Sequence, residues 1–154
     1  MSVDTSLQTA KALLERVRGQ IPLTAAMQLR VTAFDGRELR LALPLAANIN
    51  DKGTGFAGSI SALGNITGWC LLTLWGEAEL GTCQVAIADA TFSFHKPVTT
   101  DFEAVVALPG EADIAGFLKR LAEKGRASLT LDLVIRDDEG TAASMKARYA
   151  LWRV

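Results

Sequence analysis

A polar loop followed directly by an uncharged helix carries the residues whose types and spacing could do chemistry. The loop covers residues 44–56 and reads PLAANINDKGTGF, which is rich in turn-forming residues. Asp51 is the only acid in it and stands next to the amide side chain of Asn50. Gly58 and Ser59 follow at the helix start, where free backbone amides and the positive end of the helix dipole can stabilise negative charge. The segment therefore predicts a site where negative charge develops.

Asn65 is the amide side chain within the helix that follows this loop. It comes seven residues after Gly58, about two helical turns along, so both residues are expected on one helix face. Its amide could orient a water or a carbonyl group without accepting a proton. If Asn65 is buried, it needs hydrogen-bond partners, and a ligand pocket or a second subunit are the two sources. The pocket is the favoured interpretation.

Other polar side chains have simpler interpretations. Ser61 and Thr67 have no histidine near them in sequence, so they are expected to bond to their own backbone rather than to act as nucleophiles. His95, the single histidine, is expected at a strand end on the surface rather than as a base. Cys70 and Cys83 lack CxxC spacing, so with one histidine we expect buried, reduced thiols and no metal site.

The helix that carries Asn65 spans residues 57–75 and contains no charged residue. A run of that length also fits a membrane span. Its serines, threonines and three glycines, together with amphipathic flanking segments, favour a helix buried in the core of a soluble domain. Its small residues are then packing positions where a sheet comes close, namely Gly58, Ala62, Gly64 and Gly68.

The rest of the chain predicts two further helices and six strands. An amphipathic helix is expected at residues 4–19 and another at 113–124, closed by Gly125. Period-two alternation predicts strands at 27–34, 37–43, 82–94, 102–108, 126–136 and 141–152. The strand at 82–94 is apolar on both faces near its centre. The sequence predicts an α+β fold, with a curved antiparallel sheet of about six strands wrapped around the long helix.

Length and composition predict one domain over residues 1–154. Apolar residues make up 49% and charged residues 21%, as in soluble globular proteins. The formal charge of -1 gives no basic field, so no nucleic-acid partner is expected. The N-terminal twenty residues mix acids and bases where an export signal would be apolar, so we expect a cytoplasmic protein.

Two motifs and the order of elements resemble the hotdog-fold acyl-CoA thioesterase superfamily. The first motif is the segment from Asn48 to Ser59, and the second is FHKPVTTD at residues 94–101. The similarity covers nearly the whole chain and is greatest to the putative thioesterase branch, whose members are sometimes fused behind an acetyltransferase domain. It implies a hotdog fold, hydrolysis of an acyl-CoA or acyl-carrier-protein thioester, and no cofactor besides that substrate.

The resemblance also assigns positions within the loop and the helix. In the phenylacetyl-CoA type of hotdog thioesterase, a loop asparagine precedes a glycine, a Gly-rich turn and a carboxylate about two turns into the helix. Asn50, Gly53 and the pair Ala57–Gly58 match the first three positions. Asn65 stands at the carboxylate position, and the helix carries no acid.

The resemblance and the residue chemistry together predict the roles in the site. The amides of Gly58 and Ser59 would stabilise the oxyanion, and Asp51 would activate a water. Asn50 and Asn65 would position the reactants. Substrate contacts are expected from the rest of the loop, at Asn48, Lys52, Gly53, Thr54 and Phe56. A turn or helix-capping role for Asp51 stays equally open.

Two other functions also stay open. Asn65 in place of a carboxylate favours an acyl-CoA-binding domain without catalysis. A hydratase or dehydratase of the same fold would need a histidine and an acid in the helix region, which this helix lacks. Similar hotdog proteins pair their sheets edge to edge with the active site between subunits, so we expect a homodimer that could pair further into a tetramer. No membrane partner is expected.

Overall fold

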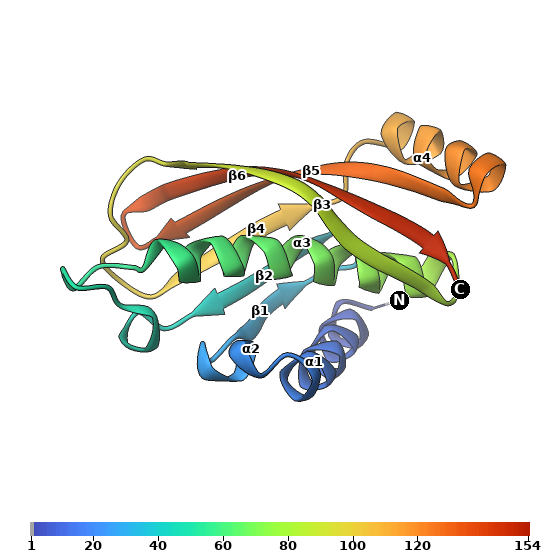
Figure 1. Ribbon diagram of the computed structural model, residues 1–154. Helices are drawn as coiled ribbons and strands as arrows, with labels where there is room; N and C mark the ends of the chain where they lie inside the picture. The colour runs from blue at the N-terminus through green and yellow to red at the C-terminus, as the bar shows by residue number, and fades with distance from the viewer. Residues whose placement is uncertain (1) are drawn as a thin grey trace.

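The computed structural model describes residues 2–154, which form one antiparallel sheet wrapped around a central helix (Figure 1). The sheet has the order β1-β2-β4-β5-β6-β3. Its strands are β1 (Arg30–Phe34), β2 (Glu38–Leu43), β3 (Cys83–Phe94), β4 (Phe102–Ala107), β5 (Arg126–Asp137) and β6 (Gly140–Arg153). The helices are α1 (Val3–Gln20), α2 (Pro22–Ala26), α3 (Ala57–Glu79) and α4 (Glu111–Lys124), with a short 3-10 turn η1 (Ala46–Asn48).

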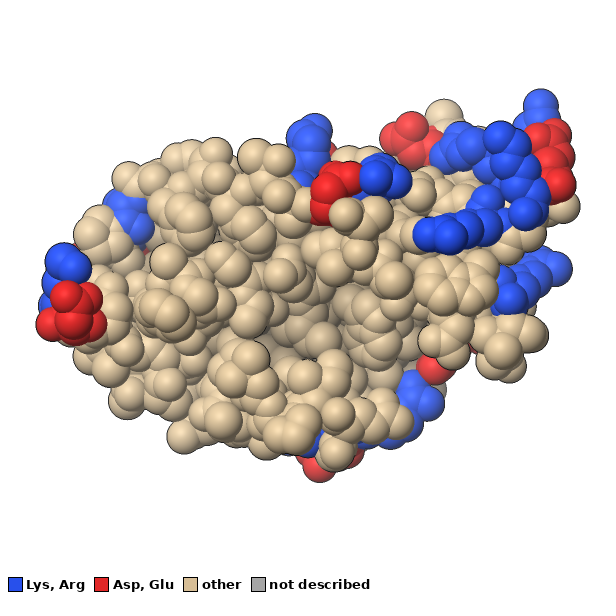
Figure 2. Space-filling view, in the orientation of Figure 1, with Lys and Arg blue, Asp and Glu red and all other residues tan. Residues whose placement is uncertain are grey.

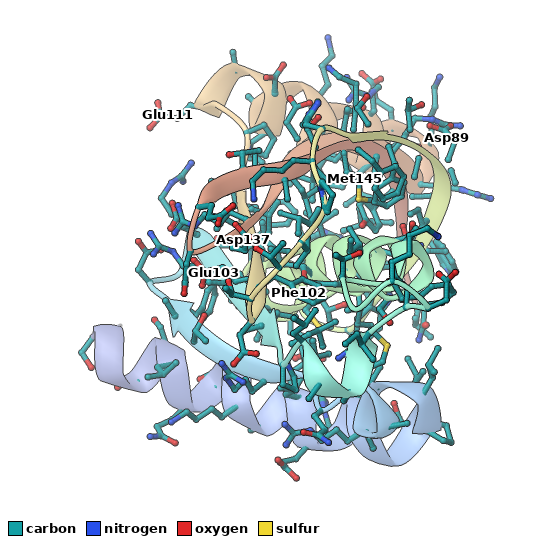
Figure 3. All side chains as sticks on the ribbon, turned by 90° about the vertical axis from the view of Figure 1, so that its left-hand side faces the viewer. Asp89, Phe102, Glu103, Glu111, Asp137 and Met145 are labelled. Atoms are coloured by element: carbon teal, nitrogen blue, oxygen red, sulfur yellow. The ribbon has the colours of Figure 1, made fainter. Side chains whose placement is uncertain are left out.

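Helix α3 lies along the concave face of the sheet, and small residues let the two surfaces meet. A Cβ placed on Gly64 would lie 2.7 Å from the sulfur of Met145, which points from β6 toward α3 (Figure 3). A Cβ on Gly68 would lie 2.2 Å from the hydroxyl of Tyr149. These glycines are therefore packing positions, as the sequence predicts, because a larger residue would push the sheet away.

The long apolar helix is the core helix of the domain. Among the described residues, α3 is the one helix long and apolar enough to cross a membrane by length and composition. The core helix of a soluble protein passes the same test, and 56% of the apolar window of α3 is buried inside this fold. Helix α4 covers the C-terminal half of α3. There Phe117 of α4 meets Trp75 of α3 edge to face, with the ring centroids 5.7 Å apart.

Several predicted element boundaries need correction. The structure extends the central helix from residue 75 to Glu79, because Gly76 packs on Cys83 and continues the helix instead of ending it. The first strand begins at Arg30 rather than at residue 27, since Gln28 has a positive φ of 59° and turns the chain. The first helix ends at Gln20, one residue beyond the prediction, and Pro22 then opens the short helix α2.

Strand β3 is an edge strand. The alternation predicted it to be apolar on both faces near its centre, yet only Val85 of its twelve residues is buried in the described structure. It pairs with β6 on one side, and Ile87 and Phe94 remain 41% and 52% exposed. Cys83, expected to be buried, is only partly so. The burial prediction failed because alternation cannot tell an edge strand from a central one.

The whole arrangement is a hotdog fold, in which six antiparallel strands curl around one long helix. The predicted α+β class and the two strands before and four strands after the central helix are confirmed. Asp35 and Gly36 form the hairpin between β1 and β2. Asp35 holds that hairpin, because its Oδ1 accepts the amides of Arg37 and Glu38 at 2.8 and 2.7 Å.

Candidate active site

The loop between β2 and α3 is organised by the side chain of Asn50. Its Oδ1 accepts hydrogen bonds from the amides of Lys52 and Thr54 at 2.9 and 3.0 Å. Its Nδ2 donates to Thr54 Oγ1 at 2.9 Å and to the Gly55 carbonyl at 3.3 Å. Gly53, with a φ of 77°, supplies the left-handed residue of this turn. The Asn50 side chain thus fixes the conformation of the loop that leads into α3.

Two further contacts fix the end of this loop. The Gly55 amide donates to the Val98 carbonyl at 2.8 Å, and a Cβ on Gly55 would lie 2.8 Å from that of Val98. Asn48, predicted to touch substrate, is 2% exposed, and its Nδ2 donates to the carbonyls of Met27 and Pro44 at 3.0 and 2.9 Å. The structure therefore places Asn48 in the framework beneath the loop.

A buried carboxylate supports the segment that contains Val98. The Oδ1 of Asp137 accepts from Lys96 Nζ at 2.8 Å, and its Oδ2 accepts from the Thr99 amide at 3.0 Å (Figure 3). Burial favours the neutral acid, but the Lys96 ammonium and the amides of Thr99 and Glu139 outweigh it and hold the pKa of Asp137 below its usual range. Sequence analysis missed this link, because Lys96 and Asp137 are far apart along the chain.

The N-terminus of α3 presents free amides. Its first intrahelical bond runs from the Ile60 amide to the Phe56 carbonyl at 3.0 Å, and no side chain in the described structure caps the helix. The amides of Ala57, Gly58 and Ser59 precede that first bond. A Cβ on Gly58 would lie 2.3 Å from the Phe56 ring, so the absent side chain is what lets the half-exposed Phe56 fold over the helix start.

A niche lies beside this helix start. It has a volume of about 380 Å³ and is lined by loop residues, by the start of α3 and by the segment after β3, including Asn50, Thr54, Gly55, Ala57, Phe94 and His95. His95 is exposed at the end of β3, as predicted, and its Nε2 lies 2.9 Å from Ser144 Oγ. The two motifs that are far apart in sequence, residues 48–59 and 94–101, therefore meet at this niche.

Asp51 and Lys52 stand at the exposed tip of the loop. Their side chains are 79% and 76% exposed, and they pair with each other at 3.2 Å. Neither side chain lines the niche or any apolar cavity described below. Within one protomer the structure brings Asn50, Thr54 and the helix start together, but it leaves Asp51 at the periphery.

Asn65 lies in an apolar groove on the open side of α3. The groove has a volume of about 280 Å³ and is lined by α3, by the α2 region and by Ile87 of β3. Figure 2 shows this face with few charged side chains and a hollow near its middle. The Oδ1 of Asn65 is buried and has no hydrogen-bond partner among the described residues. Asn65 thus lines a groove, and its acceptor is free in this chain for a ligand, a water or a second subunit.

The backbone at Asn65 is held from the sheet side. Tyr149 is fully buried and donates its hydroxyl to the Asn65 carbonyl oxygen at 2.9 Å. Burial raises the pKa of the Tyr149 phenol, and burial raises the pKa of the nearby Cys70 thiol to about 12. Both groups therefore stay protonated near neutral pH, which agrees with the predicted inert role of Cys70.

The helix start and Asn65 are separated along α3. Seven residues at the helical rise place Asn65 about 10 Å beyond Gly58. Residues that act on one carbonyl group must approach it within hydrogen-bond distance. Gly58 and Asn65 of one chain therefore do not both reach a single carbonyl group directly. Among the described residues, no group of three or more His, Cys, Asp or Glu side chains is arranged to hold a metal ion.

Comparison with known proteins gives one family match and several similar structures. The model of the family described as "Putative thioesterase (yiiD_Cterm)" matches residues 10–153. A putative thioesterase from Shewanella oneidensis is 27% identical, with 96% of this chain and 97% of that chain covered and a TM-score of 0.78. A protein of unknown function from Chlorobaculum tepidum is 26% identical, with 97% and 99% covered and a TM-score of 0.89.

A third structure supports the fold alone. It is a protein from Pseudomonas aeruginosa described as a probable thioesterase, 24% identical, with 94% of each chain covered and a TM-score of 0.80. Since the similar structures span nearly their whole length and nearly all of this chain, the match concerns the complete fold and not a local motif.

Proposed function

Because the chain belongs to the putative thioesterase family and is therefore an acyl thioester hydrolase, we propose that it cleaves an acyl thioester of coenzyme A or of an acyl carrier protein at the N-terminus of α3. The uncapped start of this helix, beside a niche that could admit a substrate, is the observation that carries the proposal. No cofactor takes part in this scheme.

Negative charge grows on the carbonyl oxygen when water attacks a thioester. The amides of Gly58 and Ser59 point along the helix axis at its positive end, where they can donate to that oxyanion. The Asn50 network fixes the loop before them, so the donors are held in place before substrate arrives. Collapse of the tetrahedral intermediate breaks the C–S bond and releases the thiol and the carboxylate.

The attacking water needs an orienting group and a proton acceptor. The unpaired Oδ1 of Asn65 accepts one hydrogen of the water and so aims its oxygen at the carbonyl carbon. Asp51 accepts the proton, and the leaving thiolate takes it up afterwards. The exposed loop tip of one copy must approach the site for Asp51 to act. Lys52, Gly53, Thr54 and Phe56 contact the carrier portion of the substrate at the mouth of the niche.

Two copies of the chain form the complete site in this proposal. Gly58 and Asn65 lie too far apart to serve one carbonyl within a protomer, whereas a second copy can supply the missing half. Strand β3 is the proposed contact between the copies, because a twelve-residue edge strand with exposed Ile87 and Phe94 can pair with a second β3. Light scattering at micromolar concentration should give the mass of a dimer, or of a tetramer built from two dimers. A monomer mass would contradict the shared site.

The remaining partners follow from the surface. A formal charge of -1 gives no basic field, so we propose no nucleic-acid partner, and the family match supports a small thioester or a carrier protein. The partly buried α3 supports a core helix rather than a membrane span, and we propose a cytoplasmic protein.

The test is thiol release from a panel of acyl-CoAs, from acetyl to palmitoyl and including aryl-acyl esters, followed by absorbance. Each acyl group is also offered on a carrier protein. Turnover above background on either carrier, lost in Gly58→Pro, would support the proposal, because proline removes one oxyanion donor. Tight acyl-CoA binding without cleavage on either carrier would overturn it in favour of a binding domain.

A further inference from the structure

The apolar groove beside Asn65 ends at a single large side chain. Along the open face of α3, Ala62, Asn65, Ile66 and Trp69 line the groove and are partly exposed. One turn further, Leu72 is fully buried and Thr73 is 6% exposed. The indole of Trp69 therefore stands at the boundary between the open groove and the closed core.

Trp69 is fixed in this position by a hydrogen bond to the sheet. Its Nε1 donates to the Val85 carbonyl oxygen at 2.8 Å, so the indole bridges α3 and β3. A ring anchored at its polar end and packed at its base has few alternative rotamers. The groove thus has a rigid end wall, about 6 Å along the helix from Asn65.

The groove is open to solvent and has a lining that suits a hydrocarbon chain. The lining is apolar except for Thr24 and Asn65, which suits a hydrocarbon chain with its carbonyl end near the amide of Asn65.

We propose that Trp69 limits the length of the acyl group, by closing the groove on the side of Asn65 that leads toward Leu72 and Thr73. The inference rests on the proposed function, since it takes the groove as the acyl site of the same reaction. The orphan acceptor of Asn65 favours this occupant over a hydrophobic segment of a protein partner, because a polar atom in an otherwise apolar groove matches the polar end of an acyl thioester.

The test compares chain-length profiles of the wild-type protein and of variants at Trp69. In the wild type, kcat/KM should rise about fourfold with each methylene that finds room and then fall once the chain reaches Trp69. Trp69→Ala opens the groove toward Leu72 and Thr73, so its optimum should move to longer chains. Trp69→Leu, which leaves an apolar filler, should shift the optimum less. Trp152→Ala removes a tryptophan from the end of β6 and should keep the wild-type profile.

Binding of unreactive alkyl thioethers of coenzyme A, measured by calorimetry, separates this inference from the proposed function. If the wild type cleaves no thioester, the function fails, but a longer optimum for thioether binding in Trp69→Ala would still support the end wall. Unchanged length profiles in folded Trp69→Ala and Trp69→Leu would overturn the inference while leaving hydrolysis intact. A change of oligomeric mass in both variants, without a change of profile, would also overturn it and would assign the groove to a second copy.

Discussion

At the scale of single residues, Asn65 needs an explanation, because its buried Oδ1 has no hydrogen-bond partner among the described residues. A buried acceptor without a partner costs free energy, and an apolar residue of similar size would avoid that cost. The protein keeps an amide there, in a groove whose lining is apolar apart from Thr24 and Asn65 itself. An amide can orient a water, but it cannot take up a proton near neutral pH.

Replacing Asn65 by alanine should lower kcat by between about tenfold and 100-fold, because the water loses its orienting acceptor. KM should change little, since the amide contributes through the water and not through the carrier portion of the substrate. Steady-state kinetics on the best acyl thioester checks this. Gln84→Ala removes an exposed amide from β3 and is the matched control. An equal loss in both variants would remove the role given to Asn65.

Asp51 gives the second prediction at this scale. If its carboxylate takes the proton from water, Asp51→Asn should lower kcat at least about 100-fold. The melting temperature should hardly change, because the side chain is 79% exposed and pairs only with the exposed Lys52. Lys52→Ala, which removes the partner and keeps the acid, should retain most of the turnover. Full activity in Asp51→Asn would leave Asp51 as a turn residue.

At the scale of elements, the glycines of α3 determine how closely the helix approaches the sheet. Gly68→Ala would place a Cβ 2.2 Å from the buried hydroxyl of Tyr149 and break its bond to the Asn65 carbonyl. We expect a loss of about 1–3 kcal/mol in unfolding free energy, measured by denaturant titration. Gly19→Ala in α1 should be neutral or stabilising, because the added Cβ would have no neighbouring atom within 4 Å among the described residues. Equal stability of the two variants would contradict this packing.

The link from Asp137 to the active-site loop is the second feature at this scale. Asp137 holds Lys96 and Thr99, and the carbonyl of Val98 between them receives the Gly55 amide just before α3. A buried carboxylate at the turn between β5 and β6 thus supports the segment that precedes the start of α3, where we propose the oxyanion donors.

Asp137→Asn should destabilise the protein by about 1–3 kcal/mol at neutral pH, because the charge-assisted bonds to Lys96 and Thr99 are lost. The folded pKa of Asp137 is lowered, so its charge stabilises the fold above the unfolded pKa of about 3.9, and that contribution disappears as pH falls through the folded value. Thermal unfolding across pH should show the two proteins converging in acid. A stability difference that stays constant down to the lowest pH would contradict the assignment.

Sequence periodicity was sufficient for most of the elements. The uncharged run at 57–75 and the alternating runs after it have only one efficient way to bury their apolar faces, which is a sheet curled around the helix. The edge position of β3 could not be predicted, because exposure of one strand edge depends on strand order and not on local pattern. Helix ends were also misplaced where a glycine packs in mid-helix, as Gly76 does against Cys83.

The candidate site was predictable in part. Turn chemistry correctly marked the loop around Asn50. Helical spacing predicted only that Asn65 shares a helix face with Gly58, and its place in the groove came from the structure. The buried position of Asn48 and the supports at Val98, Asp137 and Tyr149 could not be foreseen, since each depends on contacts between segments far apart in the chain. In the sequence, Trp69 does not differ from other apolar helix residues. Its place at the end of the groove depends on its hydrogen bond to Val85.

At the scale of the whole molecule, the open face of α3 and the edge strand β3 lie side by side on a surface nearly free of charge (Figures 1 and 2). Exposed Leu23, Phe56, Ile87 and Phe94 belong to the elements of this surface, which is costly to leave in water. The proposed dimer pairs two copies through β3, covers this surface and combines the Gly58 of one copy with the Asn65 of the other.

Subunit complementation tests this central claim most directly. Asn65→Ala and Gly58→Pro each damage one half of the proposed site, so each pure variant should be nearly inactive. In a re-equilibrated equal mixture, about half of the dimers are mixed, and each mixed dimer holds one intact site made of Gly58 from one chain and Asn65 from the other. Thioesterase activity should then recover to about one quarter of the wild-type value. A mixture that exchanges subunits and stays inactive would contradict a site shared between two copies.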